Sequence, residues 1–248
     1  MPANNLGQYL AEIETISADM HLHLYSHPLA SFCHKVLIAL YENGTAFEAH
    51  LVDLGNPDAK AEFCELWPVG KMPVLRDEAR DRTVPETTVI IEYLEQHHPG
   101  ARPLLPHDAD ERLDVRLWDR FFDLYVQMPV QKIVVDRIRP QASRDPCGVA
   151  EARATLANAY DMLEQRMRER SWTCGGDFSL ADCAAAPALF YAGIVAPFPP
   201  GHTHLAAYFE RLMARPSVQR TIAEARPYFH MFPFVEAMPA RFLHGGAP

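Results

Sequence analysis

Strand-like and helix-like hydrophobic patterns alternate over the first hundred residues of the chain. Strands alternate apolar and polar positions, whereas amphipathic helices repeat apolar positions every three or four residues. The predicted strands lie at residues 21–25 and 47–52 and on both sides of a turn at residues 77–82, and the predicted helices lie at residues 31–43, 56–66 and 86–97. Two strands joined by a helix pair in parallel with a right-handed crossover. The order β-α-β-α-β-β-α therefore predicts an α/β unit at residues 21–98 with one mixed four-stranded sheet.

A proline-rich linker separates this unit from a second half that has no strand pattern. Residues 99–107 contain three prolines, which makes them the best domain boundary in the chain. Residues 108–225 show only helix patterns and predict an all-helical domain, with a kink at Pro129 in its first long helix. Residues 1–20 remain as an N-terminal extension. Residues 226–248 form an aromatic and proline-rich tail, which must cover an apolar surface or self-associate.

Composition and charge narrow the possible partners. The chain has 248 residues, is 48% hydrophobic and 22% charged, and carries a formal net charge of −9, which argues against a nucleic-acid partner. Five cysteines without a Cys-x-x-Cys pair suggest neither a disulfide framework nor a zinc site, so we expect no metal and a cytoplasmic location. No stretch approaches the roughly 20 apolar residues of a membrane helix, and we expect no membrane partner and no secretory signal.

One stretch of the chain places a Met-Pro loop directly before a strand and then begins a helix. Met72-Pro73 precedes the strand, a position at which a residue without an N–H is tolerated. After the turn, Glu86, Thr87 or Thr88 can cap the next helix. A helix start that carries a hydroxyl binds carboxylates, because its free N–H groups and its dipole point outward. We expect the loop and the helix start to lie side by side.

Four short motifs occur in a fixed order across both halves of the chain. They are Leu24-Tyr25-Ser26-His27-Pro28 leading into Val36-Leu37-Ile38-Ala39-Leu40, then Gly70-Lys71-Met72-Pro73-Val74-Leu75, then Pro85-Glu86-Thr87, and finally Gly176-Asp177-Phe178-Ser179-Leu180-Ala181-Asp182. Each motif alone is weak, but together they resemble the cytosolic glutathione transferases over roughly residues 20–225. The resemblance implies a thioredoxin-like N-terminal domain, a helical-bundle C-terminal domain and a two-fold homodimer.

The resemblance also implies how glutathione is bound. In this family the proline matching Pro73 is cis, and the backbone of the preceding residue, here Met72, pairs with the cysteinyl part of glutathione. Glu86 and Thr87 would hold the γ-glutamyl end, the first through the ammonium group and the second through the carboxylate. Lys71 would contact the peptide backbone or a carboxylate of glutathione.

The electrophile pocket of this family lies between the two domains. Phe32 is a further candidate contact of glutathione and a candidate wall of that pocket. Aromatic residues of the long helix are other candidate walls, namely Trp118, Phe121, Phe122 and Tyr125. An aromatic stripe at helical spacing is more often part of a core or of a dimer interface, so this interpretation competes with a purely structural one. The tail after residue 226 could cover the pocket.

Several groups compete for the catalytic role. The family needs a hydroxyl or thiol beside the glutathione sulfur, because a hydrogen bond to the thiolate lowers the pKa of the thiol. Members with a tyrosine place it at the end of the first strand, where this chain has Ser26. Members with a serine or cysteine place it at the start of the first helix, where the count falls on Ala30. Ser31, a plausible N-cap of that helix, is our first candidate; Cys33, Ser26 and the backbone N–H groups remain alternatives.

The leading functional hypothesis is a glutathione S-transferase that activates the thiol of its co-substrate glutathione for attack on a small hydrophobic electrophile, as in detoxification. A glutathione-dependent thiol-disulfide oxidoreductase is one alternative, and it would need a protein thiol such as Cys33. A glutathione-binding protein without catalytic activity is the other, and Ala30 keeps it open.

Overall fold

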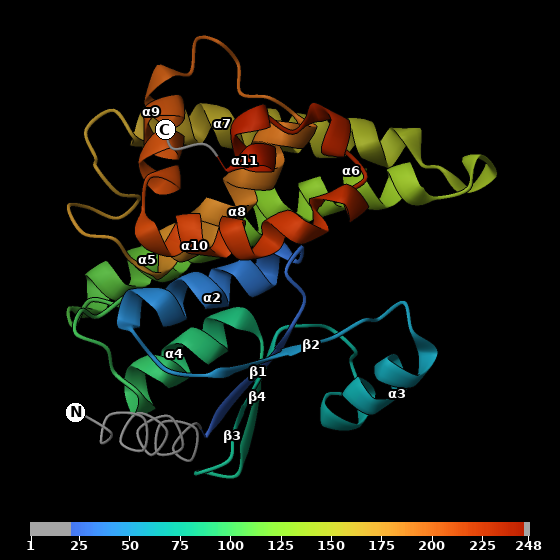
Figure 1. Cartoon of the computed structure of the whole chain (residues 1–248). Coiled ribbons are helices and arrows are strands. Elements are labelled where there is room, and N and C mark those ends of the chain that lie inside the picture. Colours follow the sequence, from blue (N-terminus) through green and yellow to red (C-terminus); the bar gives the residue numbers. More distant parts are fainter. Residues whose placement is uncertain (1–20, 246–248) are drawn as a thin grey trace, which may run out of the picture.

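The computed structural model describes residues 21–245, which form a four-stranded mixed sheet with its helices, followed by a bundle of helices (Figure 1). The first part consists of β1 (Leu22–Ser26), α2 (Ser31–Asn43), β2 (Glu48–Leu51), α3 (Pro57–Leu66), β3 (Val74–Asp77), β4 (Arg82–Pro85) and α4 (Thr87–His97). The sheet order is β2-β1-β3-β4, with β1 parallel to β2 and antiparallel to β3. The predicted thioredoxin-like unit is confirmed. The predicted extension at residues 1–20 lies outside the described residues.

The two faces of the sheet have different partners. In β1, Leu22 and Leu24 point into the main core, which contains apolar side chains of α2 and α4, whereas His23 and Tyr25 point to the opposite face. That opposite face is partly covered by α3, whose Phe63 belongs to a small second core. Because side chains alternate along a strand, one side of β1 packs into the main core and the other side carries the His23 and Tyr25 rings.

The second part is helical, as predicted. It contains α5 (Ala109–Phe121), the π-helical segment η1 (Phe122–Gln127), α6 (Met128–Ile138), a short 3₁₀ turn η2 (Gln141–Ser143), α7 (Pro146–Arg166), α8 (Leu180–Val195), α9 (Thr203–Met213) and α10 (Pro216–Ala225). The central helix α8 is buried along nearly its whole length. It begins with the capping box expected from the sequence, because the carboxylate of Asp182 accepts hydrogen bonds from the N–H and the hydroxyl of Ser179.

The long helical region changes its hydrogen-bond pattern at a different place from the predicted kink. The π-helical segment η1 interrupts it before Pro129, and Pro129 lies in the first turn of α6, where a missing N–H is tolerated. None of the helices between residues 21 and 245 is both long and apolar enough to cross a bilayer.

The aromatic tail packs against α8 through η3 (Arg226–Met231), η4 (Val235–Ala237) and α11 (Ala240–His244). Phe242 meets Phe190 edge-on with ring centroids 5.0 Å apart, and Phe232 lies 5.2 Å from Tyr191. The prediction that the tail covers an apolar surface of the chain is confirmed for the residues up to 245.

Candidate functional site

The strand register brings three distant segments to one end of the sheet. Tyr25 pairs with Val74, and Val74 pairs with Pro85. Because both ladders are antiparallel, the next positions along them are Ser26, the Met72–Pro73 peptide and Glu86. The Met72–Pro73 peptide is cis. The Met-Pro loop and the start of α4 therefore lie side by side, as the sequence predicted.

The start of α4 has the form of an anion site. Glu86 adopts φ 69° and ψ 120°, a backbone conformation that costs a residue with a side chain on the order of 1–3 kcal/mol and is concentrated at functional sites. Thr87 is buried and is the first residue of the helix, whereas the Glu86 side chain is exposed and makes no capping hydrogen bond. Within residues 21–245 no acceptor is found for the N–H groups of Thr87 and Thr88. These donors are free to receive a carboxylate.

The start of α2 provides a second set of free backbone N–H donors. The N-cap is Ala30, not Ser31 as expected, so Ser31 occupies the first helical position and its side chain does not cap the helix. In the described part of the chain the N–H groups of Ser31 and Phe32 have no acceptor. Ser31 and Phe32 line a pocket between α2, η1 and α8. A thiolate placed there would meet both the serine hydroxyl and the helix N-terminus.

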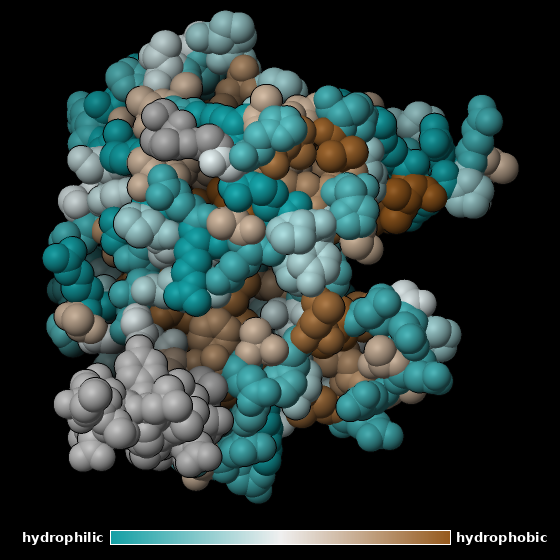
Figure 2. All heavy atoms as spheres, in the orientation of Figure 1, coloured by the Kyte–Doolittle hydropathy of each residue, from teal (hydrophilic) through white to brown (hydrophobic). Residues whose placement is uncertain are grey.

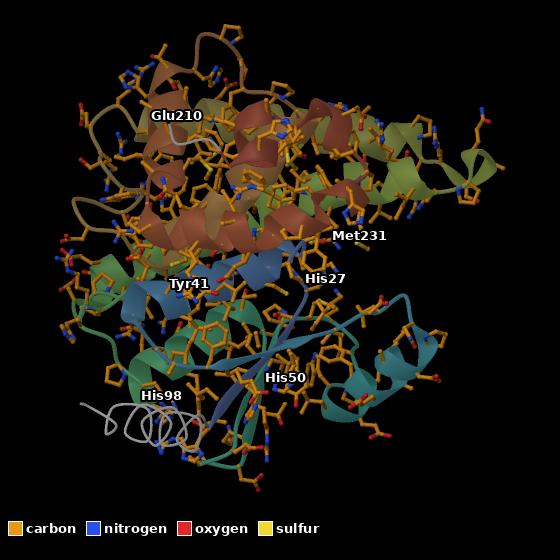
Figure 3. The ribbon with its side chains drawn as sticks, in the orientation of Figure 1. His27, Tyr41, His50, His98, Glu210 and Met231 are labelled. Atoms are coloured by element: carbon orange, nitrogen blue, oxygen red, sulfur yellow. The ribbon has the colours of Figure 1, made fainter. Side chains whose placement is uncertain are left out.

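The loop that leads into Ser31 is held by other elements. Tyr191 of α8 donates a hydrogen bond to the carbonyl of Leu29 over 2.9 Å. His34 of α2 donates its Nε2–H to the carbonyl of Pro28. The His27 ring meets Tyr228 of the tail edge-on, with ring centroids 5.5 Å apart. Figure 2 shows the surface hollowed between α3 and α6, and Figure 3 places His27 and Met231 at the inner end of this hollow.

The two histidines beside the loop favour their neutral forms. Burial lowers the pKa of His34 to about 4, because the imidazolium form loses its hydration. Burial also lowers the pKa of His27, although Asp53 acts in the opposite direction. They therefore contribute hydrogen bonds and packing to the site rather than positive charge.

The other candidates for thiol activation occupy less favourable positions. Cys33 is fully buried, and burial raises the pKa of its thiol to about 12, so it is protonated at neutral pH. Ser26 is buried on the core side of β1. The neighbouring Tyr25, which was not a candidate, faces the opposite side of the sheet, where its ring stacks on His50 with centroids 4.7 Å apart.

A buried charge cluster connects the two parts of the protein one helical turn after Ser31. Lys35 of α2 is 1% exposed, and its Nζ lies 2.6 Å from Asp119 Oδ1 of α5 and 2.9 Å from Asp123 Oδ2 of η1. It also donates to the hydroxyl of Thr88, which in turn donates to Asp119 over 2.6 Å. The sequence analysis missed this cluster. Its signal is a lysine inside an otherwise apolar helix, because a buried lysine requires acidic partners.

The aromatic residues expected to form the pocket wall lie elsewhere. Trp118, Phe121 and Phe122 are buried in the main core, and Tyr125 is half exposed. For the first three residues the structural alternative is confirmed, because α5 and the start of η1 turn their aromatic side chains toward the core. Besides Phe32, the apolar side chains that line the small cavity beside Ser31 belong to α8 and are Ala184, Pro187 and Ala188. Lys71 is exposed directly before the Met-Pro loop.

Comparison with known proteins agrees with this architecture. The family model described as glutathione S-transferase, N-terminal domain, matches residues 24–102, and the corresponding C-terminal domain matches residues 126–216. The chain is 33% identical over 173 residues to glutathione S-transferase-like protein LUC7 of Fusarium sp, an overlap of 68% of this chain and 76% of that protein. It is 29% identical over 207 residues to a stringent starvation protein A homolog of Coxiella burnetii, covering 82% of this chain and 91% of the homolog.

A solved structure gives the same result in three dimensions. The crystal structure of a glutathione S-transferase from Methylobacterium radiotolerans, in complex with glutathione sulfonate, matches with a TM-score of 0.71 and 30% identity over 81% of this chain and 93% of that chain. Sequence motifs, fold and relatives agree, and the chain belongs to the cytosolic glutathione S-transferase family.

Proposed function

We propose that this protein is a glutathione S-transferase that activates the glutathione thiol for attack on a small hydrophobic electrophile, as in detoxification. The observation that carries the proposal is that two helix starts with free N–H donors, at Ser31 and Thr87, flank the same end of the sheet as the Met72–Pro73 peptide. Such a site can receive a peptide that has a carboxylate at one end and a thiol in the middle.

Glutathione fits this arrangement in one direction. Its γ-glutamyl carboxylate lies at the start of α4 on the hydroxyl and N–H of Thr87, and its ammonium group faces Glu86. Its cysteinyl backbone pairs with the backbone of Met72, next to Pro73. Lys71, which is exposed, supports the far end of the tripeptide. The thiol then points toward α2.

Ser31 and the start of α2 supply the activation. The hydroxyl of Ser31 and the free N–H groups of Ser31 and Phe32 donate to the sulfur, which stabilises the thiolate and lowers the thiol pKa from about 8.5. The thiol proton leaves to solvent. The sulfur then forms a C–S bond to the electrophilic carbon, while a leaving group departs or an activated double bond takes up the electron pair. Holding the two substrates next to each other in a reactive orientation supplies the rest of the acceleration.

The test is to titrate the thiol of bound glutathione by its thiolate absorbance in the wild type, Ser31→Ala and Ser143→Ala, a control on an exposed turn. We expect a bound-thiol pKa well below 8.5 in the wild type and the control. In Ser31→Ala the pKa should rise, and turnover of a chlorodinitrobenzene electrophile should fall about 10- to 100-fold, while glutathione still binds. A normal thiol pKa in the wild type would overturn the proposal. A low pKa unchanged by Ser31→Ala would assign activation to the backbone donors.

The two alternatives differ in how much the structure supports them. A thiol-disulfide oxidoreductase lacks a reactive protein thiol here, because Cys33 is buried and protonated. A glutathione-binding protein without catalysis remains compatible with Ala30, and the same titration separates it, since it would bind glutathione without lowering the thiol pKa.

We further propose a homodimer in a reducing cytoplasm. Leu113 and Leu117 of α5, Leu124 of η1 and Met128 of α6 follow one another at helical spacing and are all exposed, which favours a partner surface and, in this family, a second copy of the chain. All five cysteines are free, which supports a compartment in which thiols stay reduced.

A further inference from the structure

Three metal-binding side chains meet on the face of the sheet that points away from the helical bundle. His23 of β1 is the Cα partner of Glu48 of β2, and His50 follows two residues later on the same side of β2. One donor atom from each of the three lies within 4.8 Å of the other two. In Figure 3, His50 lies at the sheet, apart from His27 and the hollow described above. These side chains are not used in the proposed glutathione chemistry.

The donor atoms lie near the spacing of a tetrahedral site. His23 Nδ1 and His50 Nε2 share a hydrogen bond of 2.9 Å, so a metal ion would displace the proton that one of them donates. The two carboxylate oxygens of Glu48 lie 3.5 Å from His23 Nδ1 and 3.6 Å from His50 Nε2. In a tetrahedral zinc site with ligands at about 2.0–2.1 Å, neighbouring ligand atoms are roughly 3.3 Å apart. An ion could therefore enter with shifts of a few tenths of an ångström.

A second carboxylate lies where histidine ligands usually have one. Glu78 Oε2 is 3.5 Å from His23 Nε2, the ring nitrogen that points away from the cluster. The contact is an ion-pair distance and not a hydrogen bond, and within the described residues this buried nitrogen has no hydrogen-bond partner. The exposed Glu78 side chain could accept its proton after a small rotation. A carboxylate on the distal nitrogen fixes the tautomer in which the other nitrogen is free to bind a metal. The ring of His50 is held as well, because it stacks on Tyr25 with an angle of 15° between the planes.

The charges around the cluster also favour a cation. Arg76 of β3 is the cross-strand neighbour of His23 on this face, but its guanidinium is paired with Asp81. Glu48 and Glu78 bring two carboxylates to the imidazoles. Glu48 is half exposed, so a fourth coordination position can be filled by water.

We propose that His23, Glu48 and His50 bind a divalent transition metal ion of the zinc type, with Glu78 orienting His23. Two imidazoles, one carboxylate and an open position suit Zn²⁺ and, by affinity order, neighbouring metals such as Co²⁺ and Ni²⁺. The ion links β1 to β2, and because it binds only the folded sheet it stabilises the fold. We expected no metal because the chain has no cysteine pairs. That argument concerns cysteine ligands and does not apply to a site made of histidine and glutamate on two strands.

The test uses the full-length chain with any affinity tag removed, freed of metal with a chelator and dialysed against ZnCl₂ without glutathione. We expect about one bound zinc per chain and a higher melting temperature with zinc. Glu48→Gln and His50→Gln should each weaken zinc binding at least about tenfold, and Glu78→Gln should do so by about tenfold. His204→Gln, on an exposed position of α9, is the control and should bind zinc as the wild type does.

Two results would overturn the proposal. One is a wild type that binds no zinc, and the other is zinc binding that Glu48→Gln leaves unchanged, which would indicate scattered surface histidines. Because Glu48 is half exposed, this variant is expected to fold even where a histidine variant does not. Replacement of zinc by Co²⁺ gives a second readout, since four-coordinate Co²⁺ absorbs visible light strongly and six-coordinate Co²⁺ weakly; a weak spectrum would overturn the tetrahedral assignment.

Discussion

Tyr191 of the central helix α8 donates its hydroxyl proton to the backbone carbonyl of Leu29, two residues before Ser31, over 2.9 Å. The bond joins residues 162 positions apart in the chain. The helical bundle therefore determines where the loop before α2 lies, although the glutathione contacts proposed above all belong to the first part of the protein. The position of the loop beside the glutathione thiol therefore depends on α8, whereas binding of the glutathione backbone depends on the first part of the protein.

Tyr191→Phe should separate these two properties. We expect the free energy of unfolding to fall by about 1 kcal/mol, since one buried hydrogen bond is lost, and kcat to fall several-fold while the Kd for glutathione changes little. Tyr160→Phe is the matched control, because the Tyr160 hydroxyl of α7 donates over 2.8 Å to the carbonyl of Ala196 at the end of α8 and not to the loop. It should lose similar stability and keep its kcat. Equal effects of both variants on kcat would contradict the positioning role of Tyr191.

His34 should make stability fall in weak acid. Its pKa is about 4 in the folded protein and about 6.5 in an unfolded chain, so between these values only the unfolded state takes up the proton, and stability is lost as the pH falls. From pH 7 to pH 5 this amounts to about 2 kcal/mol. Urea unfolding across this range should show the loss in the wild type. His34→Gln, which can still donate to Pro28, should lack that part of it; parallel curves for the two proteins would be inconsistent with a buried neutral imidazole.

Removal of Lys35 should destabilise the protein far more than removal of a surface lysine. Lys35→Ala leaves Asp119 buried without its cation and leaves Asp123 only the half-exposed Arg120. Breaking such a buried cluster costs about 3–5 kcal/mol. Lys132→Ala breaks the half-exposed pair with Asp145 and should cost less than about 1 kcal/mol. Denaturant unfolding of both variants checks the difference. Similar losses in the two would show that the Lys35 cluster is hydrated in solution.

Leu117→Asp should convert the proposed dimer into monomers. A carboxylate in the middle of the exposed stripe would be buried on association without a partner, which costs several kcal/mol. Sedimentation at micromolar concentration measures the change. Ile138→Asp is the control, because Ile138 is as exposed as Leu117, at 65% against 64%, and lies at the end of α6 outside the stripe. A wild type that sediments as a monomer would refute the dimer itself.

The local sequence pattern predicted most of the strands and helices in the first half of the fold. Alternation around Leu24, the break at Pro85 and the cis-compatible Met72-Pro73 are all short-range signals, and together they located the strands and the helix starts. The position of Ser31 was harder, because a shift of one residue at a helix start depends on the path of the preceding loop, which Tyr191 holds from a distance.

Features that depend on long-range contacts could not be predicted in this way. Lys35 and Asp123 are 88 residues apart. The apolar residues around Lys35 indicate that it needs an acidic partner, but they do not indicate which one. The direction in which Trp118 points depends on the rotation of α5 against α8, which a repeat of three or four residues does not determine. His23 and His50 are separated by a helix and meet only through the parallel register of β1 and β2.

The position of β2 in the sheet also affects aggregation. With the order β2-β1-β3-β4, β2 is an edge of the sheet, and unpaired strand edges can template pairing with another chain. Here the edge strand has four residues and presents Glu48 and His50. Short, charged edges resist the addition of a foreign strand. The two side chains that we propose as metal ligands therefore also help to keep each sheet from growing into its neighbour at high protein concentration.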